Sequence, residues 1–132
     1  MARHLEHAGI RPDLVLCSSS VRARQTLERL ARAIPEGTPV EIEEALYAAG
    51  SSTLIERLRR VPPEREAVLV IAHNPGLQEL ALLLAGRGPD LGRLAEKFPT
   101  GALATLAHDG AWTELRAGAC ELLELVFPRE LP

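Results

Sequence analysis

Two places in the sequence combine side chains that can bind a phosphoryl group. Ser18 to Ser20 are followed by Arg22 and Arg24, and His73 stands immediately before Asn74-Pro75. Arginine binds phosphate oxygens through two parallel N–H donors, and serine hydroxyls can donate to the same oxygens. An imidazole changes charge near neutral pH and can stabilise a phosphoryl group. Both places are therefore candidate parts of one anion-binding site.

Each place lies where an apolar run passes into a helical pattern. The runs Asp13 to Cys17 and Ala67 to Ala72 are typical of strands that are buried on both faces of a parallel sheet. The serines can cap the helix after the first run, and Asn74-Pro75 can begin a Leu-rich helix that extends to about Gly86. Ligands of such sheets bind beyond the carboxyl ends of the strands, where the following helices begin. We therefore expect both places to open onto one sheet edge.

The position of the arginines supports this expectation, although a simpler interpretation also exists. Arg22 and Arg24 fall in the first turn of their helix, where the macrodipole disfavours a cation unless an anion is bound. In the simpler interpretation, both arginines point into water and His73 is a structural residue at a strand end. The occurrence of both junctions in one predicted sheet favours the phosphoryl site.

The rest of the chain predicts an α/β domain over residues 1–132, with a largely parallel sheet. Strands alternate with helices, and no internal repeat or low-complexity linker interrupts them. The further elements are a short edge strand within Pro39 to Leu46, a helix over Ser51 to Arg60, an antiparallel hairpin of Ala102 to Ala107 with Ala111 to Arg116 around Asp109-Gly110, and a strand or short helix over Cys120 to Phe127.

Composition argues against several classes of function. The 15 basic and 18 acidic residues are mixed along the chain to a net charge of −3, so we expect no basic surface for nucleic acid or an anionic membrane. The longest apolar runs are far shorter than the roughly 20 residues that a membrane helix needs. Cys17 and Cys120 alone cannot form a disulfide framework or a zinc site, which favours a reducing cytoplasm.

Taken together, these residues resemble the histidine phosphatase superfamily, also called phosphoglycerate mutase-like, and in particular its small SixA-type branch of phosphohistidine phosphatases. The resemblance implies a three-layer fold with a mostly parallel sheet. Its segments are Pro12 to Thr26, which contains Ser-Ser-Ser-Val-Arg-Ala-Arg-Gln-Thr, Val70 to Leu77, which contains Ala-His-Asn-Pro-Gly, and the stretches Phe98 to Ala102, Trp112 to Leu115 and Phe127 to Arg129.

The resemblance also implies an activity and roles for individual residues. Arg22 would be the phosphate-binding arginine and His73 the second active-site histidine, and Ser18 is our further candidate for phosphate binding. The implied enzyme removes phosphoryl groups from phosphohistidine or small phosphoesters through a phosphohistidine intermediate, with no metal and no cofactor. Its partner would be a phosphorylated protein histidine or a small phosphorylated substrate. Larger relatives add a carboxylic acid for the leaving group, and here Glu43 and Glu44 lie in the corresponding stretch without either being assigned.

One part of the family's pattern is absent. The family's nucleophile is a His in Arg-His-Gly or Arg-His-Ala at the end of a first, central strand, whereas this chain starts with a helical pattern that Gly9 would end. Arg3-His4 is no substitute, because a bulky residue follows it and no apolar strand precedes it. We expect His4 and His7 to be exposed helix residues or, less simply, a weak metal pair. The absent strand is expected to belong between Leu14 to Leu16 and Val68 to Ile71.

Three hypotheses about function remain open at this point. The first is a phosphatase whose chain lacks the first strand, and the second is a non-catalytic phosphate-binding or regulatory domain that uses Arg22 and His73 for recognition alone. The third is an inactive fragment that folds poorly, because the removal of a central strand exposes unpaired sheet edges. Under all three, the 132-residue chain by itself is expected to have no meaningful turnover.

Overall fold

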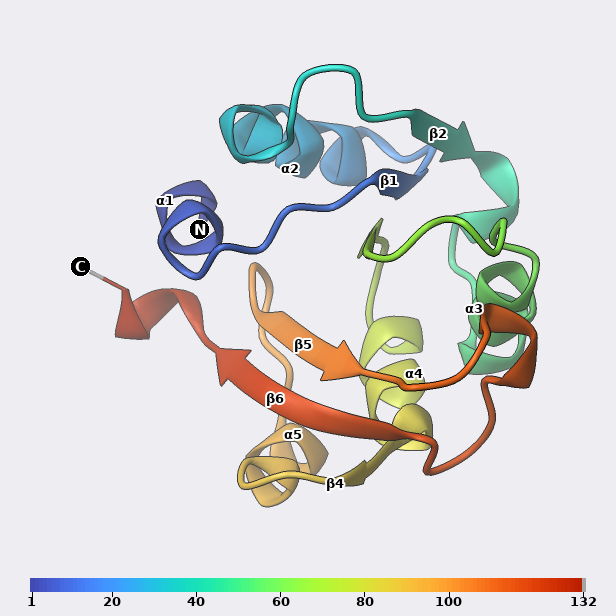
Figure 1. The fold of residues 1–132 in the computed structure, drawn as a ribbon. Coiled ribbons are helices and arrows are strands. Elements are labelled where there is room, and N and C mark those ends of the chain that lie inside the picture. The colour runs from blue at the N-terminus through green and yellow to red at the C-terminus, as the bar shows by residue number, and fades with distance from the viewer. Residues whose placement is uncertain (132) are drawn as a thin grey trace.

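The computed structural model, which describes residues 1–131, contains two three-stranded sheets with helices packed around them (Figure 1). The predicted α/β class is confirmed. Within the described residues, no helix is both long enough and apolar enough to cross a membrane. The helices and strands are α1 (Ala2–His7), β1 (Leu14–Ser18), α2 (Val21–Leu30), β2 (Val40–Glu43), α3 (Ser51–Arg59), β3 (Val68–Ile71), α4 (Gly76–Leu84), β4 (Ala85–Arg87), α5 (Leu91–Glu96), β5 (Leu103–Ala107) and β6 (Cys120–Val126).

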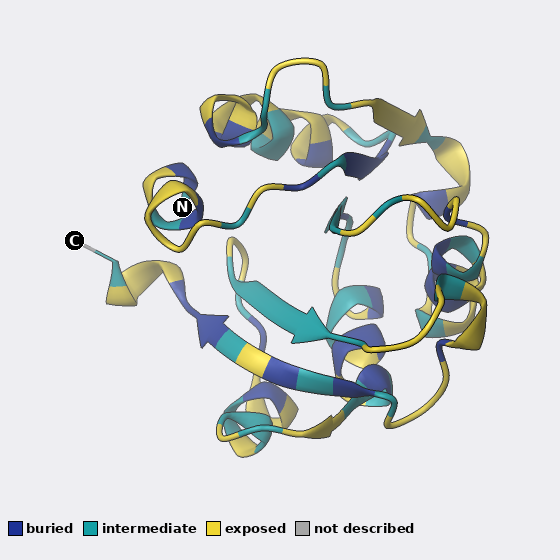
Figure 2. Ribbon diagram, in the orientation of Figure 1, coloured by how far each residue is buried: buried dark blue, intermediate teal, exposed yellow. Residues whose placement is uncertain are grey.

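Strand β1 is the centre of the first sheet, which has the order β2-β1-β3 and parallel strands throughout. All residues of β1 are buried, as Figure 2 shows in dark blue. Val15 and Cys17 belong to a hydrophobic cluster with α1 and α2, whereas Leu14 and Leu16 belong to a cluster with α3 and α4. The strand predicted near Asp13 to Cys17 is therefore confirmed, together with its burial on both faces.

The helix that follows β1 begins as predicted, and the one that follows β3 differs slightly. Ser20 caps α2, since its hydroxyl oxygen accepts a hydrogen bond from the Ala23 N–H at 3.1 Å. In α4 the cap position is Pro75, one residue later than predicted. Asn74 still contributes to the start of this helix, because its Oδ1 accepts a hydrogen bond from the Gln78 N–H at 3.3 Å. Both helices nevertheless begin at the carboxyl ends of parallel strands.

The predicted place of the absent strand, between β1 and β3, is wrong. The two strands pair directly, with Leu14 opposite Val68 and Cys17 opposite Ile71. Strand β3 is therefore a terminal strand of its sheet, and three of its residues, 68–70, are only half-buried. The reason is that an all-apolar run indicates side-chain burial on two faces, and does not give the number of hydrogen-bonded neighbours.

The second sheet has the order β4-β6-β5, and it corrects the predicted hairpin. Strands β5 and β6 are antiparallel, with Leu103 opposite Val126. The partner of β5 is thus not the segment Ala111 to Arg116, part of which forms a single 3₁₀ turn, Trp112–Glu114. Of the two alternatives for the segment from Cys120 onward, the strand is correct.

Strands β3 and β5 end their sheets next to each other in one layer. From top to bottom, Figure 1 shows the strands in the order β2, β1, β3, β5, β6, β4. Leu69 and Leu103 pack against the same hydrophobic cluster on one side, and Val70 and Leu106 share the other. Each of the two strands has one hydrogen-bonded neighbour, and β5 is half-buried along its whole length. Within the described residues, the two sheets therefore have open backbone edges at the place where they meet, one on β3 and one on β5, in addition to the outer edges on β2 and β4.

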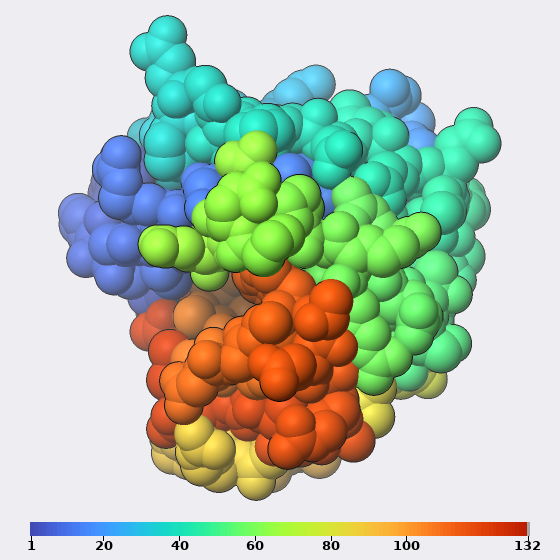
Figure 3. All heavy atoms as spheres, turned by 45° about the vertical axis from the view of Figure 1, so that its right-hand side comes forward, coloured from blue at the N-terminus to red at the C-terminus, as the bar shows by residue number. Residues whose placement is uncertain are grey.

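Asp13 ties the start of β3 to the start of β1. Its carboxylate accepts hydrogen bonds from the N–H groups of Glu66 at 2.9 Å and Ala67 at 3.1 Å. On the other side of this segment, Trp112 Nε1 donates to the Arg65 carbonyl at 2.7 Å. In Figure 3 the green segment accordingly lies between the blue and cyan N-terminal part and the orange C-terminal part. These bonds help to fix the register of β3.

The Asp13 contacts predict a pH-dependent stability. Burial alone would raise the pKa of Asp13, but the N–H donors of Glu66 and Ala67 outweigh it and bring the pKa below its ordinary value of 3.8. The carboxylate therefore stabilises the fold above about pH 4, and this stabilisation is lost as the pH falls through the folded-state pKa. We expect Asp13→Asn to lower the free energy of unfolding by about 1 kcal/mol at pH 7 and by clearly less at pH 3. Urea denaturation measures both values, with Asp109→Asn at an exposed position as the control; an equal loss at both pH values would contradict the assignment.

The open edges predict uneven amide protection. Every N–H of β1 faces a partner strand, whereas alternate N–H groups of β3 and β5 point away from their single neighbour. We expect the least protected amides of β3 and β5 to exchange at least about tenfold faster than those of β1. Hydrogen exchange read by NMR, on a sample shown to be monomeric by light scattering, measures this ratio. Uniform protection across the three strands would show that the edges are paired in solution.

Candidate functional site

The carboxyl ends of β1 and β3 bring Ser18 and His73 together. Because Cys17 lies opposite Ile71 in a parallel pair, the residues that follow leave the sheet at the same edge. Ser18 Oγ lies 3.0 Å from His73 Nε2, although 55 positions separate the two residues in sequence. The two junctions therefore meet at one edge, as predicted.

The Ser18 hydroxyl orients the His73 ring. Ser18 is fully buried, at 0% exposure, and its Oγ also accepts a hydrogen bond from the Ser20 N–H at 3.3 Å. Since Ser20 caps α2, the hydroxyl links the imidazole to the start of that helix. The hydrogen bond restrains the orientation of the ring. Direct contact of Ser18 with phosphate stays a prediction, because the geometry assigns its hydroxyl to His73.

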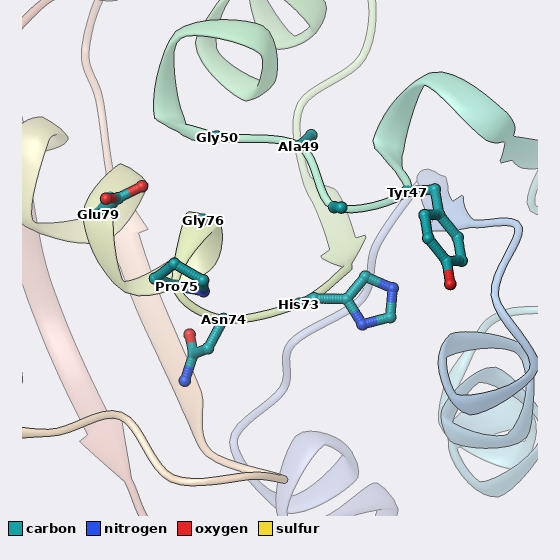
Figure 4. Close-up of a pocket in the computed structure, with 9 residues that line it drawn as sticks. Tyr47, Ala49, Gly50, His73, Asn74, Pro75, Gly76 and Glu79 are labelled. Carbon is teal, nitrogen blue, oxygen red and sulfur yellow. The ribbon is translucent and has the colours of Figure 1, made fainter.

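The second ring nitrogen of His73 is available to a ligand. Within residues 1–131, the contact with Ser18 is the one hydrogen bond that the ring makes. The side chain is half-buried, and it borders a pocket of about 270 Å³ at the N-terminus of α4 (Figure 4). Nδ1 can therefore approach a phosphoryl oxygen while Ser18 holds Nε2.

Tyr47 is the neighbour of His73 that the sequence interpretation missed. Its ring centroid lies 5.8 Å from that of the imidazole, with the planes tilted by 57°. Tyr47 is 61% exposed, although Leu46 just before it is buried. Its one available signal was that it is the single tyrosine of the chain, in a small-residue stretch before a predicted helix.

Arg22 follows the same carboxyl edge of the sheet, and no hydrogen bond joins it to His73 within the described residues. It occupies the first turn of α2 and is exposed, and its guanidinium makes no hydrogen bond or ion pair within the described chain. Arg24 is exposed and unpaired in the same way, so exposure does not distinguish the two arginines. Phosphate binding by Arg22, and its preference over Arg24, therefore remain predictions.

Neither Cys17 nor Ser18 is suited to attack a substrate. Burial raises the pKa of the Cys17 thiol, with only partial opposition from the charge of Arg24, and the reactive thiolate is therefore disfavoured. Ser18 and His73 have the separation of a serine–histidine pair, but a nucleophile must be accessible and Ser18 is 0% exposed.

His4 is not the exposed residue that the sequence predicted. Its side chain is 22% exposed, and its Nε2 lies 2.9 Å from Glu124 Oε1 on β6. A helix at the surface of a small protein still packs one face inward, and His4 lies next to that face, adjacent to buried Leu5. His7 is exposed as expected. Among residues 1–131, no three His, Cys, Asp or Glu side chains are grouped closely enough to hold a metal ion.

Of the two carboxylates proposed near the site, Glu43 already has a partner. Arg57 Nε contacts Glu43 Oε1 at 2.9 Å, and its NH2 contacts Glu43 Oε2 at 2.9 Å. This hydrogen bonding raises the pKa of Arg57 above its ordinary value. The pair links β2 to α3, so Glu43 serves the fold and is poorly placed to protonate a leaving group. Glu44 is exposed.

Comparison with known proteins connects this geometry to a family. No family model matches the chain. The chain is 37% identical over 121 residues to the uncharacterized protein Rv1276c of Mycobacterium tuberculosis (strain ATCC 25618 / H37Rv), a match that covers 89% of this chain and 74% of the relative. The uncharacterized protein ML1117 of Mycobacterium leprae (strain TN) is 34% identical over 120 residues, covering 89% of this chain and 72% of that protein. The aligned part is thus a smaller share of each relative than of this chain.

Solved structures identify the family. The structure described as SixA from Nakamurella multipartitia has a TM-score of 0.76 and 26% identity, covering 96% of this chain and 81% of that one. The protein histidine phosphatase SixA in complex with tungstate has a TM-score of 0.77 and 25% identity, covering 99% of this chain and 78% of that one. The chain belongs to the histidine phosphatase superfamily, in its SixA branch.

For this SixA-type chain, the Ser18 hydrogen bond predicts a specific effect on His73. Ser18→Ala removes the partner of Nε2 and leaves the Ser20 N–H without its acceptor. We expect the ¹⁵N resonance of His73 Nε2 to shift and the free energy of unfolding to fall by about 1–2 kcal/mol. Ser19→Ala is the matched control, since the Ser19 hydroxyl makes no hydrogen bond within the described residues, and should change stability by less than about 0.5 kcal/mol. An unchanged imidazole spectrum in Ser18→Ala would rule out the orienting role.

Proposed function

We propose that the chain is a cytoplasmic phosphatase domain that acts on phosphohistidine, with His73 and Arg22 binding the phosphoryl group. The observation that carries this proposal is the contact between Ser18 and His73, 3.0 Å long, at the carboxyl edge of a parallel sheet. The likeness to SixA structures, with TM-scores of 0.76 to 0.78, supports a phosphorylated histidine as the substrate.

The described residues have distinct roles in this proposal. His73, held at Nε2 by Ser18, contacts a phosphoryl oxygen through Nδ1. Arg22 neutralises further oxygens with two parallel N–H donors, and the free N–H groups at the start of α2 add to the positive potential there. Phosphoryl transfer depends mainly on such positioning and charge stabilisation, so these groups suffice without a metal ion.

The nucleophile in this proposal is a histidine on a strand that pairs with the open edge of β3. His73 stands just beyond the carboxyl end of β3, and a strand parallel to β3 would end beside it. The nucleophilic imidazole forms a bond to phosphorus in line as the bond to the substrate imidazole breaks. The departing imidazole takes up a proton, and water then cleaves the new phosphohistidine and releases phosphate. The lability of the P–N bond reduces the need for a dedicated acid, which fits the engagement of Glu43 by Arg57.

A non-catalytic phosphate-binding domain is the second candidate. It is favoured by the burial of Cys17 and Ser18, which leaves the described edge able to hold a phosphoryl group without attacking it. Both candidates require the same anion site, and they differ in whether a nucleophile joins it.

The anion site is tested by comparing the two arginines. We expect vanadate to bind at this edge, and Arg22→Ala to weaken binding about tenfold or more, because a desolvated two-donor contact is much stronger than an exposed one. Arg24→Ala, two residues away on the same helix and equally exposed, is the matched control and should weaken binding less than about threefold. Titration followed by NMR locates the site and gives both affinities. Equal effects of the two substitutions, or no binding by a folded sample, would count against the proposed function.

A further inference from the structure

The pocket beside His73 contains an aromatic side chain that binding of the phosphoryl group does not use. Residues 47–50 form one wall of this pocket, and the start of α4 forms the other (Figure 4). Tyr47 stands at the His73 end and is 61% exposed, which makes it one of the most exposed large apolar side chains among the described residues. An exposed aromatic ring at the border of a ligand site often marks recognition of that ligand.

The backbone on both sides of Tyr47 is held by its neighbours in the fold. Leu46, which precedes it, is 1% exposed and anchors the segment in the core. Ala48 adopts φ 53°, a left-handed conformation that residues other than glycine rarely take. Gly76 lies against this segment, and a Cβ there would overlap the carbonyl oxygen of Ala49. Strained backbone that the surrounding structure maintains is common at binding sites.

The Tyr47 ring presents a surface that suits a flat, cationic group. It meets His73 at a centroid distance of 5.8 Å and a tilt of 57°, a usual geometry for aromatic neighbours. Most of Tyr47 nevertheless remains exposed to solvent beside His73. A ring that leaves the phosphoryl group while taking up a proton becomes an imidazolium, and an aromatic face attracts such a cation more strongly than the neutral ring.

We propose that Tyr47 is a specificity-determining residue that stacks on the substrate's own imidazole while His73 and Arg22 hold the phosphoryl group. This inference rests on the proposed function and adds the basis on which phosphohistidine is preferred to a phosphoester of an aliphatic alcohol. Such an ester has no ring to stack on Tyr47 and forms no cation when it leaves. Tyr47 therefore contributes to recognition of the leaving group and not to binding of phosphate itself.

The experiment compares two probes on the chain and its variants. The probes are inorganic phosphate and a short peptide that carries the stable phosphohistidine analogue phosphoryl-triazolylalanine, and calorimetry measures both affinities. We expect Tyr47→Ala to weaken binding of the peptide by about three- to tenfold, since an aromatic contact contributes about that much free energy. The affinity for phosphate should stay unchanged. Tyr47→Phe keeps the ring and should retain the affinity of the unsubstituted chain. Ile42→Ala, at an exposed apolar position on β2, is the matched control and should affect neither probe.

The outcomes separate this inference from the proposed function. An equal loss of both probes in Tyr47→Ala would assign Tyr47 a structural role, and unchanged peptide binding would remove it from recognition; either result overturns the inference while the anion site stands. Failure of the unsubstituted chain to bind either probe would overturn the proposed function, and the inference with it.

Discussion

The parallel pairing of β1 with β3 is the constraint on which the rest of the structure depends. It places the carboxyl ends of two strands, and the starts of α2 and α4, at one edge of the sheet. Ser18 and His73 can share a hydrogen bond across 55 residues of sequence only because this register aligns them. Asp13 lies at the opposite end of the same two strands. Its carboxylate supports the register by accepting hydrogen bonds from the N–H groups of Glu66 and Ala67, just before β3. The contact between Ser18 and His73 is thus a consequence of strand pairing.

Among the described residues, the same arrangement leaves one side of β3 without a hydrogen-bonded strand. The layer continues at β5, whose side chains share hydrophobic clusters with those of β3 although the two strands do not pair. The open edge of β3 lies beside His73, so an additional strand that paired with it would extend the sheet and end near the candidate site. In the proposed function, structural completion and catalytic competence therefore depend on the same pairing.

The sequence was sufficient for the features that local patterns determine. The apolar runs before Ser18 and His73 predicted two buried parallel strands, and the Ser20 cap and the meeting of the two junctions followed from helix and sheet geometry. Pairing partners were not predictable in the same way, because β5 selects β6 by packing against a common core and not by the turn signal at Asp109-Gly110. The prediction of an absent strand between β1 and β3 was wrong for a related reason. An apolar run indicates that side chains are buried, and it does not identify the strands that pair with it. Tyr47 was missed because its importance lies in a contact across the fold, not in a motif.

The most direct test of this account is the rate of phosphohistidine hydrolysis when the open edge of β3 is filled. A strand ending in Arg-His-Gly, joined through a flexible linker ahead of α1, is compared with the same strand carrying Gln in place of that His, and with the 132-residue chain alone. The account predicts that both added strands raise the melting temperature, and that only the histidine-bearing strand produces turnover, which His73→Ala then abolishes. Robust turnover by the 132-residue chain, or a stabilised histidine-bearing protein without turnover, would contradict it.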